Sequence, residues 1–461
     1  MSSPEHLLVF ARLPEPGKSK TRLIDAFGAP RAAALYRALA EHTLAMASRF
    51  ASQRGCSLTI CFSDGNSNAM ATEFGSHYVY RAQQGDDLGC RLIHAIQQAF
   101  SSGADRVVVI GTDCHKLTEQ QLAQAFDRLR SDLPSGNLNS SETDSRDTQA
   151  GCDVVLGPAI DGGYYLIGLN LPQPLLFEGI DWGTERVLDQ TKFIACEAGS
   201  RCTELSPLCD VDFPEDVLSM RDERAGFPDE LFKIQPGRIS IVVPTLNEAG
   251  QLEQTLQAIG TPGPQLEIII VDAGSRDRSL EIAQEHGCQT FTVDRGRGAQ
   301  MNAGAAVSSG QTLLFLHADT HLPSGYRACV EDCLAAGHVA GAFRLGITGQ
   351  RLGLRIVEHG ANLRSRWLQM PYGDQALFMR ASTFFNLGGF GRLPIMEDYE
   401  LVVRLRRIGK IGLLPQRVAT SGRRWLKRGI LKTTAINQLC LLAYRLGISP
   451  QRIANFYRRQ G

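Results

Sequence analysis

The sequence predicts an α/β protein made of two successive domains, each with a largely parallel sheet. Short apolar runs typical of buried strands alternate with longer amphipathic stretches such as residues 30–52. Strands that alternate with helices predict βαβ units and therefore parallel pairing. A chain of 461 residues also exceeds the roughly 250 to 300 residues at which a single core stops growing. The strand-like runs lie at residues 7–10, 58–62, 107–110 and 154–156, and again at 239–243, 268–271 and 313–316.

A polar segment separates the two series of strands. Residues 226–237 carry Pro228 and Pro236 and end in a glycine, which predicts a linker between a domain of residues 1–225 and a domain of residues 238–461.

Residues 134–151 consist mainly of Ser, Asn, Asp, Thr and Gly. Such a segment cannot offset its ordering entropy by burial, so we expect a mobile surface insertion.

Composition excludes several classes of protein. The formal net charge is zero, with 48 basic and 48 acidic residues, so no global field recruits nucleic acid or an anionic membrane, and any steering must come from local charge. The twelve cysteines are scattered without a CxxC or a zinc-ligand spacing, which indicates reduced thiols. We see no export signal and no run of about 20 apolar residues. These features predict a cytoplasmic protein without an integral membrane segment.

The N-terminal half places cations directly after its first strand. Lys18, Lys20 and Arg22 follow Gly17 and precede a helix, an arrangement that can cradle phosphates through charge and backbone donors. The order of residues lacks the GxxxxGK[ST] pattern of a P-loop, which disfavours an ATPase.

Carboxylates follow on later segments of the same half. Asp113 comes after the strand at 107–110, Asp161 lies in a glycine-rich turn, and Asp212 belongs to the segment DVDFPED. Asp113 and Asp212 could converge on one cation, as a nucleotide site requires. The alternative is that both are helix caps and that the glycines form a plain turn.

As a series, PGKSKTRL, GTDC, GPAIDGGYYLIGL, WGTERVL and DVDFPEDV resemble a DUF2064-type family of bacterial GT-A-like proteins over most of residues 7–221. Those proteins are similar to nucleotidyltransferases such as phospholactate guanylyltransferase. The resemblance implies a GT-A-like domain that handles a nucleotide or nucleotide sugar. His115 and Phe213 replace a usual proline and threonine, and neither change removes a candidate ligand.

In the C-terminal half, two apolar strands end in ionisable residues. The first stops at Asp272, and the second runs into His317 and Asp319. Two parallel strands that end in this way describe the ligand edge of an open α/β sheet, where a divalent cation can be held against a diphosphate. Alternatively, an Asp after a buried strand is only the N-cap of the next helix.

Other polar segments of this half could bind the donor. The turn PTLNE supplies Pro244, Asn247 and Glu248, and RGRGAQMNAG supplies Arg295, Arg297 and Asn302 before a helix. Guanidinium groups beside glycines suit a diphosphate or ribose. Residues 420–428 concentrate cations without an acid, and each cation over a leaving diphosphate would contribute on the order of 4 kcal/mol at 4 Å and an effective dielectric near 20. A solvated basic face is the alternative.

A carboxylate is also needed to take a proton from an attacking sugar hydroxyl. The segments YGDQ, with Asp374, and MEDYE, with Glu397 and Asp398, supply candidates.

The ordered set PTLNE, VDAGS, RGRGAQMNAG, FLHAD, GDQ, MEDYEL and SGRRW closely resembles the family 2 glycosyltransferases of the GT-A fold, and more narrowly a small subgroup associated with arsenosugar biosynthesis, over nearly all of residues 239–458. The resemblance implies that Asp272 contacts the nucleotide and that His317 and Asp319 occupy the DxD metal motif. It also implies that Asp398, aided by Glu397, is the base. Arg424 and Trp425 would match the end of the QxxRW element, although the Gln is absent.

We therefore expect two GT-A-like, Rossmann-like nucleotide-diphospho-sugar transferase domains in tandem. The second would transfer a sugar from a UDP- or GDP-type nucleotide sugar to a small soluble acceptor with Mg²⁺ or Mn²⁺. The first would handle a nucleotide or nucleotide sugar. Two alternatives stay open for the first: a nucleotidyltransferase that releases pyrophosphate, and a catalytically silent binding or assembly module.

Overall fold

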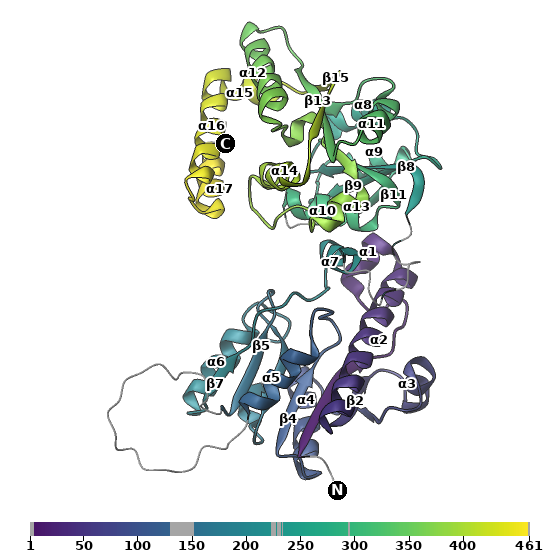
Figure 1. The fold of residues 1–461 in the computed structure, drawn as a ribbon, viewed down its shortest axis with the longest axis vertical. Helices are drawn as coiled ribbons and strands as arrows, with labels where there is room; N and C mark the ends of the chain where they lie inside the picture. The colour runs from purple at the N-terminus through teal and green to yellow at the C-terminus, as the bar shows by residue number, and fades with distance from the viewer. Residues whose placement is uncertain are drawn as a thin grey trace, which may run out of the picture. The chain divides into compact units, whose positions relative to one another are not determined.

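The computed structural model describes residues 4–129, 152–222, 227, 232, 234–293 and 296–459 (Figure 1). The chain forms two compact units: unit 1 comprises Met1–Ile24, Gly28–Asp212 and Gly226–Leu231, and unit 2 comprises Asp25–Phe27, Phe213–Ala225 and Phe232–Gly461. The proposed insertion at 134–151 lies outside the described residues, and so do residues 226, 228–231 and 233 of the proposed linker at 226–237. The domain boundaries at 225 and 238 stay a prediction, because short segments near the junction alternate between the units.

Unit 1 contains a seven-stranded mixed sheet in the order β3-β2-β1-β4-β6-β5-β7. The strands are β1 (Glu5–Arg12), β2 (Ser57–Ser63), β3 (Tyr80–Ala82), β4 (Arg106–Ile110), β5 (Val154–Pro158), β6 (Tyr164–Leu169) and β7 (Cys202–Glu204). All pairs are parallel except those that β6 makes with β4 and β5. The four strand-like runs of this half therefore all form strands, and the run at 164–169 adds an antiparallel one.

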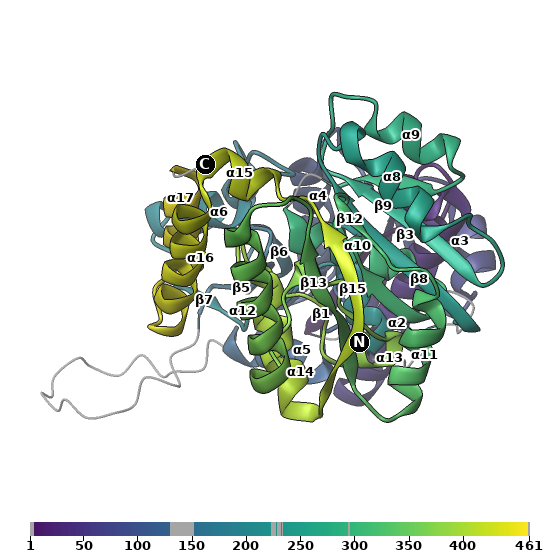
Figure 2. The same cartoon turned by 90° about the horizontal axis from the view of Figure 1, so that it is seen from above.

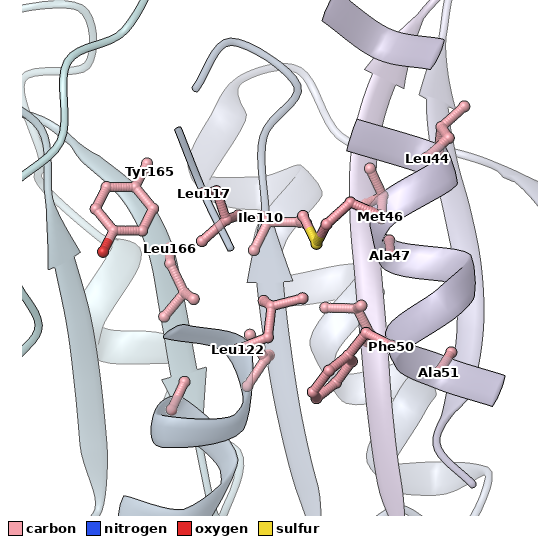
Figure 3. Packing of buried hydrophobic residues seen from close by; sticks show 14 of the residues in the cluster. Leu44, Met46, Ala47, Phe50, Ala51, Ile110, Leu117, Leu122, Tyr165 and Leu166 are labelled. Atoms are coloured by element: carbon pink, nitrogen blue, oxygen red, sulfur yellow. The ribbon is translucent and has the colours of Figure 1, made fainter. Parts of the chain in front are cut away.

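Both faces of this sheet are covered by helices. On one face, α2 (Ala29–Arg54) and α5 (Glu119–Arg128) bury Phe50 and Leu122 in a cluster that includes Ile110 of β4 (Figure 3). Alternate residues of β1, such as Leu7, belong to the same cluster. On the other face, α4 (Leu88–Ser101) and α6 (Val187–Glu197) pack with Leu8. Because neighbouring strand residues point to opposite faces, the continuous apolar run of β1 is explained by burial on both sides. Unit 1 also contains η1 (Thr21–Leu23), α3 (Ser67–Phe74) and η2 (Pro174–Phe177). The segments η3 (Pro214–Asp216) and α7 (Val217–Asp222) belong to unit 2, as does α1 (Ile24–Phe27) apart from Ile24.

Unit 2 contains an eight-stranded sheet in the order β10-β9-β8-β11-β14-β13-β15-β12. Its strands are β8 (Gln235–Thr245), β9 (Leu266–Asp272), β10 (Gln289–Thr292), β11 (Gly310–Phe315), β12 (Thr320–His321), β13 (Ala340–Ile347), β14 (Phe378–Arg380) and β15 (Ile411–Thr420). β8 is parallel to both β9 and β11, so the carboxyl ends of these three strands meet at one edge. The predicted α/β class is confirmed for both units.

The helices of unit 2 cover this sheet and extend beyond one end of it (Figure 2). They are α8 (Ala249–Ile259), α9 (Ser279–Glu285), α10 (Arg297–Val307), α11 (Tyr326–Ala335), α12 (Leu352–Leu368), η5 (Gly373–Gln375), α13 (Ala381–Asn386), α14 (Glu397–Ile408), α15 (Arg423–Arg428), α16 (Ile430–Arg445) and α17 (Pro450–Arg459). In the part of the chain that the structure describes, no helix has the length and apolarity needed to span a bilayer.

Helix α10 packs tightly on the strands that carry the ligand edge. A Cβ atom added at Gly304 would lie 2.4 Å from Val242 Cγ1 and 3.1 Å from Val271 Cγ2, whereas one added at Gly360 in α12 would meet nothing within 4 Å. We expect Gly304→Ala to lower the free energy of unfolding of unit 2 by about 1 to 3 kcal/mol through overpacking. The matched control Gly360→Ala should raise it by roughly 0.5 to 1 kcal/mol through helix propensity. Urea unfolding followed by circular dichroism measures both, and equal effects of the two substitutions would contradict this packing.

Candidate functional site

The candidate site of unit 2 lies where β8, β9 and β11 end. Glu248 follows β8, Asp272 ends β9, and Asp319 follows β11. Because β8 lies between the other two strands, the three loops are neighbours along one edge of the sheet. This is the edge at which open α/β sheets bind their ligands.

Asp272 is fully buried and shapes its own loop. Its Oδ2 accepts hydrogen bonds from the backbone N–H groups of Gly274 at 2.8 Å and Ser275 at 2.6 Å, and Oδ1 accepts one from the Ser275 hydroxyl at 2.5 Å. These bonds fix the turn that follows β9. A direct contact of Asp272 with a nucleotide stays a prediction.

Two predicted donor-binding amides also hold the local backbone. Asn247 adopts a left-handed conformation with φ of 54°, and its Oδ1 accepts a hydrogen bond from Arg276 N at 2.8 Å, which joins the loops after β8 and β9. Asn302 is buried and pairs with both backbone groups of Phe390 at 2.8 Å. Pro244 lies within β8, opposite Val271. The side chains of Asn247 and Asn302 therefore have clear structural roles, which account for these residue types without a donor.

Arg423 bridges two carboxylates at the sheet edge. Its Nη2 lies 2.5 Å from Glu248 Oε2 and 3.5 Å from Asp319 Oδ2. The hydrogen bond from Arg423 to Glu248, followed by the charge of that carboxylate and of Asp319, raises the pKa of the guanidinium. Arg423 was not among the residues that we singled out from the sequence, although its neighbour Arg424 was. The side chain of Arg424 lies outside the described part of the structure, and so does Arg295.

His317 and Asp398 converge on the short helix η5. Asp398 Oδ2 accepts a hydrogen bond from Gly373 N at 2.8 Å, and Oδ1 lies 2.7 Å from Tyr399 N. A Cβ atom added at Gly373 would lie 3.1 Å from His317 Nε2 and 3.3 Å from Asp398 Oδ2. A side chain at this position would therefore crowd both His317 and Asp398. Asp374 follows Gly373 in η5, so it lies next to the point at which His317 and Asp398 approach each other.

Glu397 and Arg297 extend this group. Glu397 is buried at the start of α14, and Arg297 Nη1 lies 3.9 Å from its Oε1. Burial raises the pKa of Glu397, the neighbouring Asp398 raises it further, and Arg297 opposes both. Glu397 therefore favours its protonated form more than an exposed carboxyl would. Trp425 packs beside Leu345, Ile347 and Leu354, where it supports α15.

Unit 1 contains a pocket of about 500 Å³ at the carboxyl ends of β1 and β4. Among the residues that line it are the cations Arg12, Lys18, Lys20, Arg22 and Arg91 and the carboxylates Asp113, Asp210 and Asp212. Lys20 Nζ lies 2.8 Å from both Asp113 Oδ1 and Asp212 Oδ1. Burial would lower the pKa of Lys20, but the charges of Asp113 and Asp212 outweigh it and raise that pKa. The structure thus brings Lys20, Asp113 and Asp212 together, as the sequence suggested.

Asp210 is a further member of this group that sequence reasoning missed. Burial, together with the charges of Asp113, Asp161 and Asp212, raises the pKa of Asp210 to about 7, while Lys20 opposes the shift. The electrostatic influence of Asp161 also places that residue near the group. The alternating acids of DVDFPED were the available signal, because residues two apart on an extended segment point to the same side.

The donor atoms of both sites fit a divalent cation. In each site a positively charged side chain lies between two carboxylates, and oxygen ligands of this kind suit Mg²⁺ or Mn²⁺. Among residues 4–129, 152–222, 234–293 and 296–459, no group of three or more His, Cys, Asp or Glu side chains is arranged to hold a metal ion by protein ligands alone. A metal in either site would therefore need further ligand atoms, from water or from a bound phosphate.

Two family models match the chain. Residues 45–184 match an uncharacterized protein family conserved in bacteria (DUF2064), and residues 240–387 match glycosyl transferase family 2. A PGL/p-HBAD biosynthesis glycosyltransferase of Mycobacterium bovis is 38% identical over 188 residues, which cover 36% of this chain and 68% of that protein. The chain belongs to glycosyl transferase family 2. It is a fusion of an N-terminal DUF2064 domain with a C-terminal family 2 domain.

The chain is also similar to other proteins. The probable glycosyltransferase YdaM of Bacillus subtilis is 25% identical over 37% of this chain, and the match spans about half (47%) of YdaM. Among solved structures, a putative nucleotide-diphospho-sugar transferase from Desulfovibrio desulfuricans G20 is 32% identical, with a TM-score of 0.42, over 49% of this chain and 89% of that one.

The raised pKa of Asp210 makes the stability of unit 1 depend on pH. The folded carboxyl keeps its proton up to about pH 7, whereas in the unfolded chain it loses the proton near 3.8, so this group destabilises the fold increasingly as pH rises from about 4 to 7. We expect Asp210→Asn to stabilise unit 1 progressively over this range and to have little effect at pH 4. Thermal unfolding in EDTA at several pH values measures the difference. A constant difference between variant and wild type would contradict the shift.

Proposed function

We propose that unit 2 transfers a sugar from a nucleotide-diphospho-sugar to an acceptor hydroxyl. Membership of glycosyl transferase family 2 supports this activity. The observation that carries the assignment of residues is the convergence of His317 and Asp398 on Gly373, next to Asp319 and its partner Arg423. These groups offer a carboxylate for proton transfer beside groups that suit a cation and a diphosphate.

In the proposed reaction, Asp398 accepts the proton of the attacking hydroxyl. The N–H groups of Gly373 and Tyr399 hold its two oxygens in place, so little reorientation is needed. Burial raises the pKa of the neighbouring Glu397, so a negative charge there is less favourable than on an exposed carboxyl. Asp319, with His317, would hold Mg²⁺ or Mn²⁺, which would offset charge on the leaving diphosphate. Arg297 and Arg423 would bind diphosphate oxygens, and the donor would be a UDP- or GDP-sugar.

The acceptor that we propose is a small molecule of the kind used in arsenosugar biosynthesis. Support for it comes from the resemblance of the ordered motifs to that subgroup.

For unit 1 we propose binding of a nucleotide or nucleotide sugar in the pocket beside Lys20. Five cations around the pocket provide charge for phosphates, and Asp113 with Asp212 provides oxygen ligands for a cation. The resemblance to phospholactate guanylyltransferase favours nucleotidyl transfer with release of pyrophosphate as a second candidate reaction.

Substitution of Asp319 should weaken donor binding, whereas substitution of Asp398 should slow the reaction. Asp319→Asn should weaken Mn²⁺-dependent UDP binding by about tenfold or more, because a metal ligand is lost. Asp398→Asn should leave UDP binding unchanged and lower kcat by roughly 10² to 10⁴, because the base is lost. Calorimetry with UDP and mass detection of product from a panel of nucleotide sugars would measure these effects. Asp332→Asn, an exposed carboxylate of α11, is the control and should keep full activity. Full transfer activity in both site variants would overturn the proposal.

Unit 1 can be tested separately through Lys18, an exposed cation that lines its pocket. Lys18→Met should weaken binding of nucleoside triphosphates with Mg²⁺ by about fivefold, and Lys192→Met in α6, outside the pocket, should have no effect. Titration calorimetry on the full chain measures both. Pyrophosphate release that disappears in Asp113→Asn would establish nucleotidyl transfer. If triphosphates and nucleotide sugars give no heat beyond binding to unit 2, unit 1 is a silent module.

A further inference from the structure

The last part of the chain carries a strong local charge. Residues 401–461 contain fourteen arginine or lysine residues and no aspartate or glutamate. This excess of positive charge does not appear in the net charge of the whole chain, because acidic residues elsewhere balance it. In unit 2, the segment includes α15, α16 and α17, which extend beyond the sheet beside α12 (Figure 2).

Helix α16 has apolar side chains on its solvent side. Thr433, Ile436 and Cys440 point into the protein and are buried. Leucines occupy the opposite side, because at 100° per residue positions 431, 439, 442 and 446 fall within one narrow arc of the helix and of its C-terminal turn. Their exposed fractions are high, as shown by Leu431 (87%), Leu439 (56%), Leu442 (54%) and Leu446 (73%).

Helix α12 has the same organisation. Its buried residues Leu354, Glu358 and Ser365 face the sheet. A second apolar stripe lies on the solvent side, formed by Leu352 (77% exposed), Ile356 (68%), Leu363 (49%) and Trp367 (75%). An apolar hollow of about 510 Å³ lies beside Leu363 and Trp367. The two helices are in contact, because a Cβ atom added at Gly353 of α12 would lie 2.9 Å from Cδ1 of Ile430, the first residue of α16.

Exposed cations border these stripes. Arg351 and Arg366 flank the stripe of α12, Lys427 and Lys432 lie at the start of the α16 stripe, and Arg452 lies in α17. The one acid in α12, α15, α16 and α17 is Glu358, which is buried and paired with Arg355. Exposed leucines and a tryptophan within a ring of cations match the chemistry of an anionic bilayer surface, whose acyl region accepts the apolar side chains while its headgroups attract the cations.

We propose that α12 and α15–α17 form a docking surface by which the protein binds peripherally to anionic membranes. A second copy of the chain fits less well, because the same cations would meet one another across a symmetric contact. The apolar stripes would lie in the headgroup region parallel to the membrane, without crossing it. Since α15 carries Arg423, the surface would also place the candidate site of unit 2 near the bilayer. The proposal is independent of the proposed transferase activity.

Vesicle flotation of the full chain tests the proposal. We expect binding to phosphatidylcholine vesicles that contain 30% phosphatidylglycerol, weak binding to pure phosphatidylcholine, and release as salt is raised. The triple variant Leu431→Gln, Leu442→Gln and Leu446→Gln should bind at least about tenfold more weakly. A matched triple variant of exposed apolar residues in unit 1, Val79→Gln, Leu175→Gln and Phe193→Gln, should bind like wild type.

Tryptophan fluorescence provides a second measurement that does not depend on multiple substitutions. Emission should shift to shorter wavelength when anionic vesicles are added, and the shift should be lost in Trp367→Phe while flotation is kept. No flotation, equal flotation with both lipids, or unchanged flotation of the α16 variant would overturn the proposal. A concentration-dependent dimer that the α16 variant abolishes would instead identify a second copy as the occupant and would also overturn it.

Discussion

Acidic side chains at the ends of adjacent strands repel one another, and this repulsion constrains both candidate sites. In unit 1 the conflict is relieved by Lys20, which lies 2.8 Å from Asp113 and from Asp212. In unit 2 it is relieved by Arg423, between Glu248 and Asp319. Removing one partner from such a group leaves an uncompensated charge, which is costly when the group is buried. In the proposed function, the same carboxylates would exchange these side chains for a metal ion and the diphosphate of a donor.

The sequence predicted the scaffold of these sites better than the role of each residue. Runs of apolar residues predict strands because burial on both faces of a sheet removes the polar alternation, and β8, β9 and β11 were all found in this way. Asp272 ends β9 and Asp319 follows β11, whereas their roles in binding stay a prediction. Asp272 and Asn302 form hydrogen bonds with backbone groups of the protein. Residue type alone could not reveal this, because Asp and Asn suit hydrogen bonds to the backbone as well as to a ligand.

Other features depend on distances that only the fold determines. Arg423 and Arg424 are adjacent residues of the same type, so the sequence does not show which of them contacts a carboxylate. The path of the chain after β15 brings Arg423 to Glu248. The approach of Gly373 to His317 and Asp398 joins three segments that are far apart in the chain. The net charge of the whole chain did not indicate the proposed docking surface. It is zero because the positive charge of the C-terminal segment is balanced by negative charge in the rest of the chain.

We propose that the acidic edge of unit 2 binds a cation that holds the diphosphate of a donor. A crystal of the protein soaked with UDP and Mn²⁺, with anomalous scattering recorded at the manganese edge, tests it most directly. We expect a peak at bonding distance from an Asp319 carboxylate oxygen and from diphosphate oxygens, with Arg423 moved away from Asp319. A UDP molecule bound elsewhere, with no manganese near Asp319 and the Arg423–Glu248 pair undisturbed, would contradict it.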